Sequence, residues 1–218
     1  AADPAGDHLP GGVLVSRRPR LLFISPRFLF PENEGGKIRT SNILRRLKGG
    51  AFEVVLASPA PEDTAAYLPS IAGVCDDFRP WPSRPASQLR RVMALAAPVP
   101  LSVATDTSAA GRAVVARALS ERPAVVVVDF PHASVLLPDD VDAASVIFTH
   151  NVEAEIFERH AKLTRGGWRL VWQNQARKMR SFERDSLRRF DSVIAVSSRD
   201  ADALRKQYGL MTVETIDT

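Results

Sequence analysis

The chain has 218 residues, 45% of them hydrophobic and 25% charged, which suits one large α/β domain or at most two small ones in a soluble protein. A net charge of only +4, an aromatic content of 7% and the lack of a recognisable nucleic-acid-binding motif exclude nucleic acid as an expected partner. The single cysteine, Cys75, excludes a disulfide framework and a multi-cysteine metal site, and no apolar run approaches the ~20 residues that span a bilayer.

The predicted elements alternate between short apolar runs and amphipathic stretches. Residues 1–18 are rich in small side chains and lack a continuous apolar segment, so we expect a flexible tail rather than a signal peptide. Short apolar runs bounded by turn residues are typical of strands buried on both faces. Strands are expected over residues 21–25, 52–57, 77–81, 124–129, 145–149, 192–196 and 211–216. Helices are expected over residues 37–48, 88–97, 111–120, 151–163, 168–190 and 198–208.

This alternation predicts an α/β fold with a doubly wound, mostly parallel, Rossmann-like sheet covered by helices on both faces. One domain over residues 19–218 accounts for the pattern. In such sheets the functional loops follow the carboxyl ends of the strands. These loops contain residues 25–36, 58–62, 129–132, 149–155 and 197–200.

Two glycines, Gly35 and Gly36, precede the first predicted helix. They let the backbone approach a ligand closely, and the free N–H groups at a helix start attract an anion. Lys37 follows them, but its spacing is not that of a P-loop, and no G-x-G-x-x-G dinucleotide fingerprint is present. The segment is therefore either an anion site or an ordinary loop that starts a helix.

Asp129 ends the valine-rich strand, and His132 follows it three residues later. An ionisable group at the tip of a buried strand is placed to face a cleft. The alternatives are a turn-capping role for Asp129 and a partly exposed surface position for His132.

A second histidine, His150, lies between the strand at 145–149 and a helix that Asn151 is expected to cap. A helix N-terminus disfavours the imidazolium form, and a neutral ring can accept a proton or hydrogen-bond a phosphate. A capping or packing role is the alternative.

The segment 159–189 is strongly basic, with ten Lys or Arg against two acids, and it contains Trp168 and Trp172. A basic helix with aromatic residues can lie on an anionic bilayer. The alternative is a solvated helix face whose tryptophans pack inward.

Four segments occur in an order and spacing that resembles the N-terminal domain of retaining glycosyltransferases of family 4, which have the GT-B fold. These segments are Phe23 to Pro26, Glu34 to Lys37, Thr149 to Glu153 and Phe190 to Ser197. The resemblance covers residues 20–218.

This resemblance implies two Rossmann-like domains with the active site between them, the present chain being the acceptor-side half. It implies that Gly35, Gly36 and Lys37 bind the phosphates of a nucleotide-diphosphate sugar, and that no coenzyme or metal is needed. The implied catalytic candidates are Asp129, His132 and His150. Family members commonly have a histidine where Asp129 stands, so this residue departs from the pattern.

The resemblance also implies a setting and a partner domain. We expect polysaccharide or glycolipid assembly in the bacterial cytoplasm and a glycan or lipid-linked acceptor. Peripheral contact with the anionic inner face of the membrane is allowed by the basic segment 159–189 and is not implied by the resemblance. The chain stops at Thr218, where family members continue into a donor-binding domain, so we expect the chain alone to be inactive. A non-catalytic Rossmann-like binding or partner-interaction module is the alternative.

Overall fold

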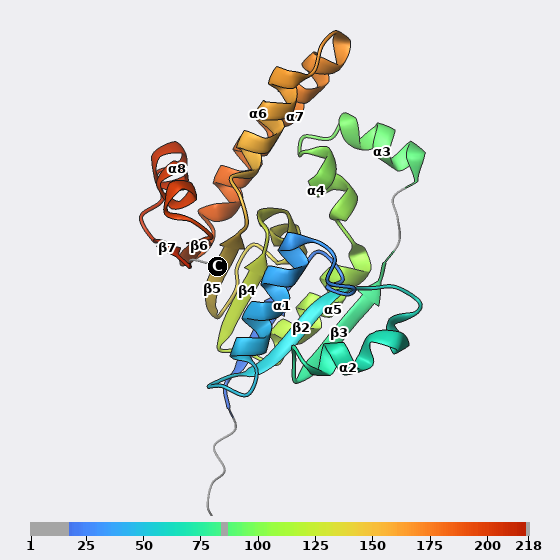
Figure 1. Cartoon of the computed structure of the whole chain (residues 1–218), viewed down its shortest axis with the longest axis vertical. Coiled ribbons are helices and arrows are strands. Elements are labelled where there is room, and N and C mark those ends of the chain that lie inside the picture. The colour runs from blue at the N-terminus through green and yellow to red at the C-terminus, as the bar shows by residue number, and fades with distance from the viewer. Residues whose placement is uncertain (1–17, 84–86, 217–218) are drawn as a thin grey trace, which may run out of the picture.

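The computed structural model describes residues 18–83 and 87–216 (Figure 1). The tail expected at residues 1–18 lies outside this description, apart from Arg18, whose guanidinium donates to the carbonyls of Gly50 and Phe52. The strands are β1 (Arg20–Ile24), β2 (Glu53–Ala60), β3 (Asp77–Pro82), β4 (Val125–Asp129), β5 (Ala144–Thr149), β6 (Ser192–Ala195) and β7 (Val213–Thr215). The helices are α1 (Gly35–Leu47), α2 (Leu68–Ala72), α3 (Gln88–Leu95), α4 (Leu101–Asp106), α5 (Ala109–Ser120), α6 (Glu153–Leu163), α7 (Gly167–Leu187) and α8 (Ser198–Tyr208).

The strands form one parallel sheet in the order β3-β2-β1-β4-β5-β6-β7, which confirms the predicted doubly wound α/β fold. The chain builds outward from β1 to β3 and then returns to place β4 on the other side of β1. Leu21 of β1 lies in register with Val54 of β2 and Val125 of β4. The two directions of growth therefore meet between β1 and β4.

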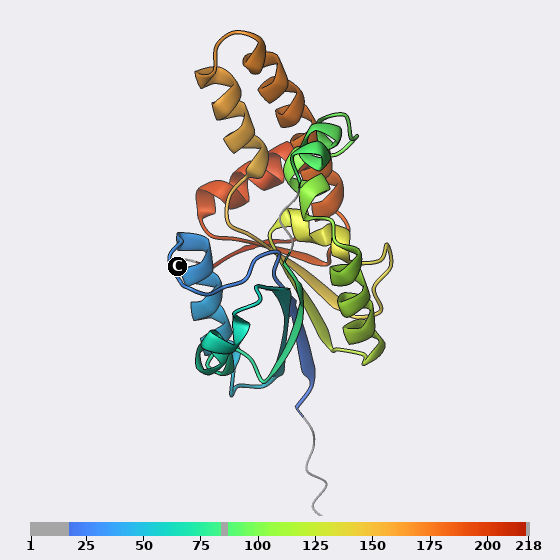
Figure 2. The same ribbon diagram turned by 90° about the vertical axis from the view of Figure 1, so that its right-hand side faces the viewer.

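Helices cover both faces of the sheet (Figure 2). Successive side chains of a strand point to opposite faces, so β1 supplies both layers of the core. Leu21 and Phe23 pack with Leu44 of α1 on one face. Leu22 and Ile24 belong to a second cluster, which contains Val115 of α5 and Leu204 of α8. Burial on both faces explains why this strand is a continuous apolar run.

Helices α6 and α7 form a hairpin that projects from the sheet (Figures 1 and 2). Its base is held by Glu183 of α7, which is fully buried. The Glu183 carboxylate accepts hydrogen bonds from the backbone N–H groups of Glu153 and Ala154 at 2.8 and 3.1 Å, and from the Tyr208 hydroxyl at 2.7 Å. No helix within residues 18–83 and 87–216 is long and apolar enough to cross a membrane.

The expected capping role of Asn151 is wrong. The N-cap of α6 is Val152, and no side chain at that position caps the helix. The Glu183 side chain supplies the cap from a distant helix instead and satisfies two N–H groups of the first turn.

Four short elements were not predicted, namely α2, α4 and two 3-10 turns, at Thr64–Tyr67 and Pro131–Leu136. Each is six residues or shorter, too short to show a helical period. The second of these 3-10 turns carries His132.

Candidate active site

The candidate site lies where the loops after β1 and β4 meet. In open parallel sheets, a crevice that binds ligands forms outside the carboxyl ends of the strands where the direction of winding reverses. Here Ser25 follows β1 and Asp129 ends β4, and the Ser25 hydroxyl donates a hydrogen bond to the Asp129 carboxylate at 3.2 Å. The topology thus places the predicted Asp129 at the position where this fold class holds its ligands.

Asp129 is the centre of a buried polar cluster, with a side chain only 1% exposed. Its Oδ2 atom accepts hydrogen bonds from Ser25 and from Thr40 of α1, the latter at 3.0 Å. Its Oδ1 atom lies 2.6 Å from Nε2 of His150, at the end of β5. The two residues that the sequence placed on neighbouring loops are therefore in direct contact.

The neighbours of His150 define its tautomer. Its Nδ1 atom lies 3.3 Å from Nη1 of Arg39 on α1, and a guanidinium can only donate, so Nδ1 is the acceptor. The ring proton then lies on Nε2 and points at Asp129. Asp129 therefore lies on one side of the His150 ring and Arg39 on the other.

Phe130 covers this pair with an aromatic ring. Its backbone has a φ of +68°, which is a genuine outlier for a bulky residue and directs the chain sharply after β4. The ring stacks on His150 with centroids 4.0 Å apart and planes at 16°. The guanidinium carbon of Arg27 lies 5.5 Å from the same ring centroid, within range for a cation–π contact.

The glycine loop approaches the same aromatic ring. A Cβ added to Gly36 would lie 3.3 Å from the Phe130 ring, whereas one added to Gly35 would have nothing within 4 Å. No side chain of the N-cap residue, Glu34, accepts a hydrogen bond from the first-turn N–H groups of α1. Lys37 turns back to its own loop, where Nζ contacts Asn33 at 3.3 Å and Glu34 at 3.7 Å.

His132 is buried, not a partly exposed surface histidine. Its Nε2 atom has no hydrogen-bond partner within the described residues, and Asp106 Oδ2 is 3.7 Å away. Burial, followed by the charges of Arg27 and His150, lowers the pKa of His132 to about 3, so the ring is neutral at neutral pH. Burial raises the pKa of Asp106 to about 6, against a smaller opposing effect of Arg27.

Sequence reasoning missed several residues of this site: Ser25, Arg27, Arg39, Thr40, Asp106, Phe130 and Glu153. Arg27 is the most informative of them, because its charge lowers the pKa values of Asp106, His132 and Glu153 alike. One exposed guanidinium therefore faces ionisable groups from three parts of the chain. The only advance signal was its place directly after the first strand.

The predicted catalytic groups are closed off from solvent in this chain. Asp129 is 1% exposed, His150 3% and His132 6%. Arg27 and the glycine loop form the accessible rim above them, because Arg27 has 54% of its side chain exposed. Asp129 and His150 can therefore orient the groups that they contact, such as the Phe130 ring stacked on His150.

Glu153 predicts a distinctive pH dependence of stability. Burial, then repulsion from Glu183, raises its pKa to about 7 against a smaller effect of Arg27. Between its unfolded pKa of about 4.5 and about 7, the folded state keeps a proton that the unfolded chain has lost, so stability falls as pH rises. Glu153→Gln should raise the free energy of unfolding by about 1–3 kcal/mol at about pH 8 and leave it unchanged near pH 4. Urea unfolding at both pH values measures the difference, and equal gains at both would contradict the assignment.

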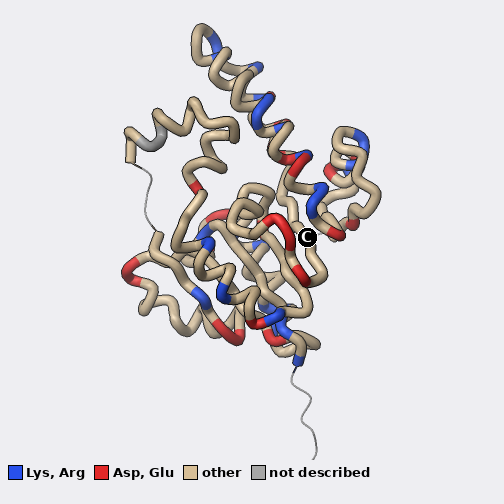
Figure 3. The backbone as a smooth tube through the Cα atoms, turned by 180° about the vertical axis from the view of Figure 1, so that it is seen from behind, with Lys and Arg blue, Asp and Glu red and all other residues tan. Residues whose placement is uncertain are grey.

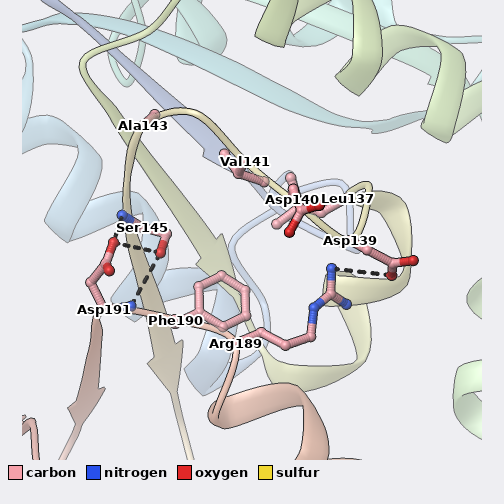
Figure 4. A pocket seen from close by; sticks show the side chains of 9 residues that line it. All are labelled: Leu137, Asp139, Asp140, Val141, Ala143, Ser145, Arg189, Phe190 and Asp191. Atoms are coloured by element: carbon pink, nitrogen blue, oxygen red, sulfur yellow. Dashed lines mark hydrogen bonds and ion pairs between the residues drawn. The ribbon is translucent and has the colours of Figure 1, made fainter.

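A separate pocket of about 270 Å³ lies at the amino-terminal ends of the strands, where β5 and β6 begin (Figure 4). Asp191 accepts hydrogen bonds from the backbone N–H and the hydroxyl of Ser145, both at 2.8 Å. Arg189 pairs with Asp139 at 3.9 Å. These contacts link the loops that precede β5 and β6. Parallel sheets bind their ligands at the opposite, carboxyl-terminal ends of the strands.

Comparison with known proteins assigns the family. A family model for Glycosyltransferase Family 4 matches residues 34–217. A search of curated proteins found no match. Among solved structures, the N-terminal domain of trehalose-6-phosphate phosphatase from Candida albicans is similar, at 12% identity and a TM-score of 0.49, over 91% of this chain and 48% of that one. The present chain thus spans about half the length of that protein chain. The family match extends over most of the sequence and confirms the resemblance of its motifs: the chain belongs to Glycosyltransferase Family 4.

Proposed function

We propose that the chain is the acceptor-binding half of a retaining glycosyltransferase that uses a nucleotide-diphosphate sugar. A donor-binding domain would complete the active site, and the reaction would serve bacterial polysaccharide or glycolipid assembly in the cytoplasm. The observation that carries the proposal is the position of the α1 N-terminus, whose glycine loop lies against Phe130 at the meeting point of β1 and β4.

The donor diphosphate would bind at the start of α1. The first turn offers backbone N–H groups and the positive end of the helix dipole. Gly35 is exposed and has open space around its Cα, so a phosphate can approach the backbone there. Arg27 lies beside this loop, paired with Glu34 at 3.2 Å, and adds a cation. The proposal needs no metal ion and no coenzyme.

The acceptor would occupy a cavity of about 480 Å³ next to this loop, at the carboxyl ends of β1, β2 and β3. Pro26, Pro59 and Trp81 line one part of it, and the connection from Thr105 to Ala110 lines another. The volume suits a sugar-sized ligand. Asp106 contributes the ionisable group of the wall, and a carboxylate is a natural acceptor of hydrogen bonds from sugar hydroxyls.

The chemistry assigns a role to each group. When the bond between sugar and diphosphate breaks, its electron pair remains on the diphosphate oxygen. The acceptor oxygen forms the new bond to the sugar, and its proton passes to the diphosphate oxygen that has left. The first-turn N–H groups and Arg27 would stabilise the charge that develops on the leaving group. Asp129 would orient His150, and His150 would hold the Phe130 ring in place through their stacking contact, while neutral His132 would lie beside Asp106 of the acceptor cavity.

A glycine substitution tests this assignment. In the complete enzyme, Gly35→Val should raise the KM for the donor by on the order of tenfold or more, because its methyl groups would occupy the space of the diphosphate. The fold should tolerate the change, since nothing lies within 4 Å of the added Cβ. Gly36→Val is less clean, because its Cβ would press on Phe130.

The chain offers a matched control. Gly167 begins α7 as Gly35 begins α1, and a Cβ there also meets nothing within 4 Å. Gly167→Val should leave the donor KM unchanged with a soluble acceptor. The donor KM is measured for both variants and the unmodified enzyme over a panel of nucleotide sugars. If all three values are equal, the phosphate site at α1 is refuted.

A further inference from the structure

The tip of the α6–α7 hairpin exposes large apolar side chains. Leu163, Trp168 and Leu170 are 77%, 67% and 69% exposed, and the hairpin carries them away from the body of the protein (Figures 1 and 2). These three residues define the hairpin tip. Soluble proteins rarely gather exposed apolar residues at one projecting point, and such patches mark interaction sites.

The tip is not simply a poorly packed part of the hairpin. Trp172, one turn further along α7, stacks on His160 at 4.7 Å and makes an edge contact with Phe157 at 5.8 Å. The inward packing that the sequence allowed for both tryptophans therefore holds for Trp172 and not for Trp168. The hairpin has its own apolar interior, so its exposed tip requires another partner.

The hairpin is also cationic. Residues 159–182 contain seven Lys or Arg and no acidic residue, and Figure 3 shows Lys and Arg positions spaced along the hairpin. Arg180 pairs with Glu158, and Lys178 donates to the carbonyls of Leu95 and Ala97. The remaining cations are exposed and make no ion pair within the described residues; they are Arg159, Lys162, Arg165, Arg169 and Arg177.

A groove of about 420 Å³ between α6 and α7 concentrates part of this charge. Lys162, Arg169 and Arg177 line it, together with the paired Arg180 and Glu158. The cations thus converge just behind the apolar tip. An anion of phosphate size is the ligand that such a set of donors recognises.

A second apolar patch lies beside the hairpin. Leu89, Val92 and Met93 of α3 are 71%, 65% and 66% exposed. The two Lys178 hydrogen bonds fasten the end of α3 to α7, and α3 lies on the same end of the molecule as the hairpin in both views (Figures 1 and 2). Two apolar patches at the same end of the molecule suit an extended surface.

We propose that the hairpin tip and the exposed face of α3 dock on an anionic bilayer surface. The apolar side chains would enter the headgroup region, and the cations of the groove would contact lipid phosphates. A second copy of the chain fits less well, because a symmetric contact through this hairpin would bring like charges together. The proposal is independent of sugar transfer, so its test uses no activity assay.

Vesicle co-sedimentation of the 218-residue chain tests the docking. The chain should bind phosphatidylcholine vesicles that contain anionic phosphatidylglycerol, and binding should weaken as salt is added. Arg165→Glu/Arg169→Glu should lower the partition coefficient by on the order of tenfold or more, since each basic residue near such a surface contributes about fivefold. Binding should shift Trp168 fluorescence to the blue, and Trp168→Phe should remove that shift while the two more buried tryptophans remain.

A charge-matched variant separates the hairpin from net charge. Arg117→Glu/Lys206→Glu changes the total charge equally at exposed positions of α5 and α8, and it should bind vesicles as the unmodified chain does. Equal losses in both double variants, or no binding to anionic vesicles at low salt, would overturn the proposal. If the chain instead self-associates without lipid, and Leu163→Ser/Trp168→Ser abolishes that self-association, the hairpin tip binds a second copy of the chain.

Discussion

Asp129→Asn is expected to lower kcat of the complete enzyme by about tenfold to a thousandfold, with a smaller change in KM. The Asp129 carboxylate accepts hydrogen bonds from Ser25 and Thr40 and faces the Nε2–H of His150. An amide nitrogen cannot accept, so at least one of these donors loses its partner and the His150 ring is no longer held in one tautomer. Steady-state kinetics over donor and acceptor concentrations measure the effect.

Two further variants show whether the effect is specific to this cluster. His150→Ala should also lower kcat, and a smaller loss than for Asp129→Asn would assign His150 an orienting role. Asp191→Asn is the matched control and should leave kcat unchanged. Asp191 also accepts two hydrogen bonds, but it lies at the amino-terminal ends of the strands, away from the candidate site (Figure 4). A folded Asp129→Asn variant with unchanged kcat would remove Asp129 and His150 from the active site.

Glu183→Ala is expected to lower the free energy of unfolding by about 3–5 kcal/mol. The substitution leaves the backbone N–H groups of Glu153 and Ala154 and the Tyr208 hydroxyl without their acceptor. All three lie where α6, α7 and α8 meet, and no nearby side chain replaces the cap, since none caps α6 from within. Urea unfolding followed by circular dichroism measures the loss.

A surface acid on the same hairpin provides the control. Glu158 pairs with Arg180 at the surface, so Glu158→Ala should cost no more than about 1 kcal/mol. Glu183→Gln keeps one oxygen acceptor and should fall between the two. Equal losses for Glu158→Ala and Glu183→Ala would show that Glu183 is not the support of the hairpin.

The sequence predicted the sheet well because each strand is a local feature. Short β-branched runs such as Val125 to Val128 are typical of strands buried on both faces of a sheet. This pattern can be recognised without knowing which distant residues pack against the strand. The same holds for the glycine loop, since Gly35 and Gly36 show a helix start by themselves. Short turns such as Pro131–Leu136 were missed, because a segment of six residues has no period to reveal it.

The sequence by itself thus determined the order of the strands and of the longer helices, and the motifs of the family. The tertiary structure alone decided which side chains meet in those loops. Asp129 contacts Ser25 and Thr40 from 104 and 89 residues away, and the cap of α6 comes from Glu183, 30 residues past Glu153. Only the fold could also separate Trp172, packed inside the hairpin, from Trp168, exposed at its tip. The reason is physical: periodicity depends on near neighbours along the chain, whereas burial and hydrogen-bond partners depend on segments that only folding brings together.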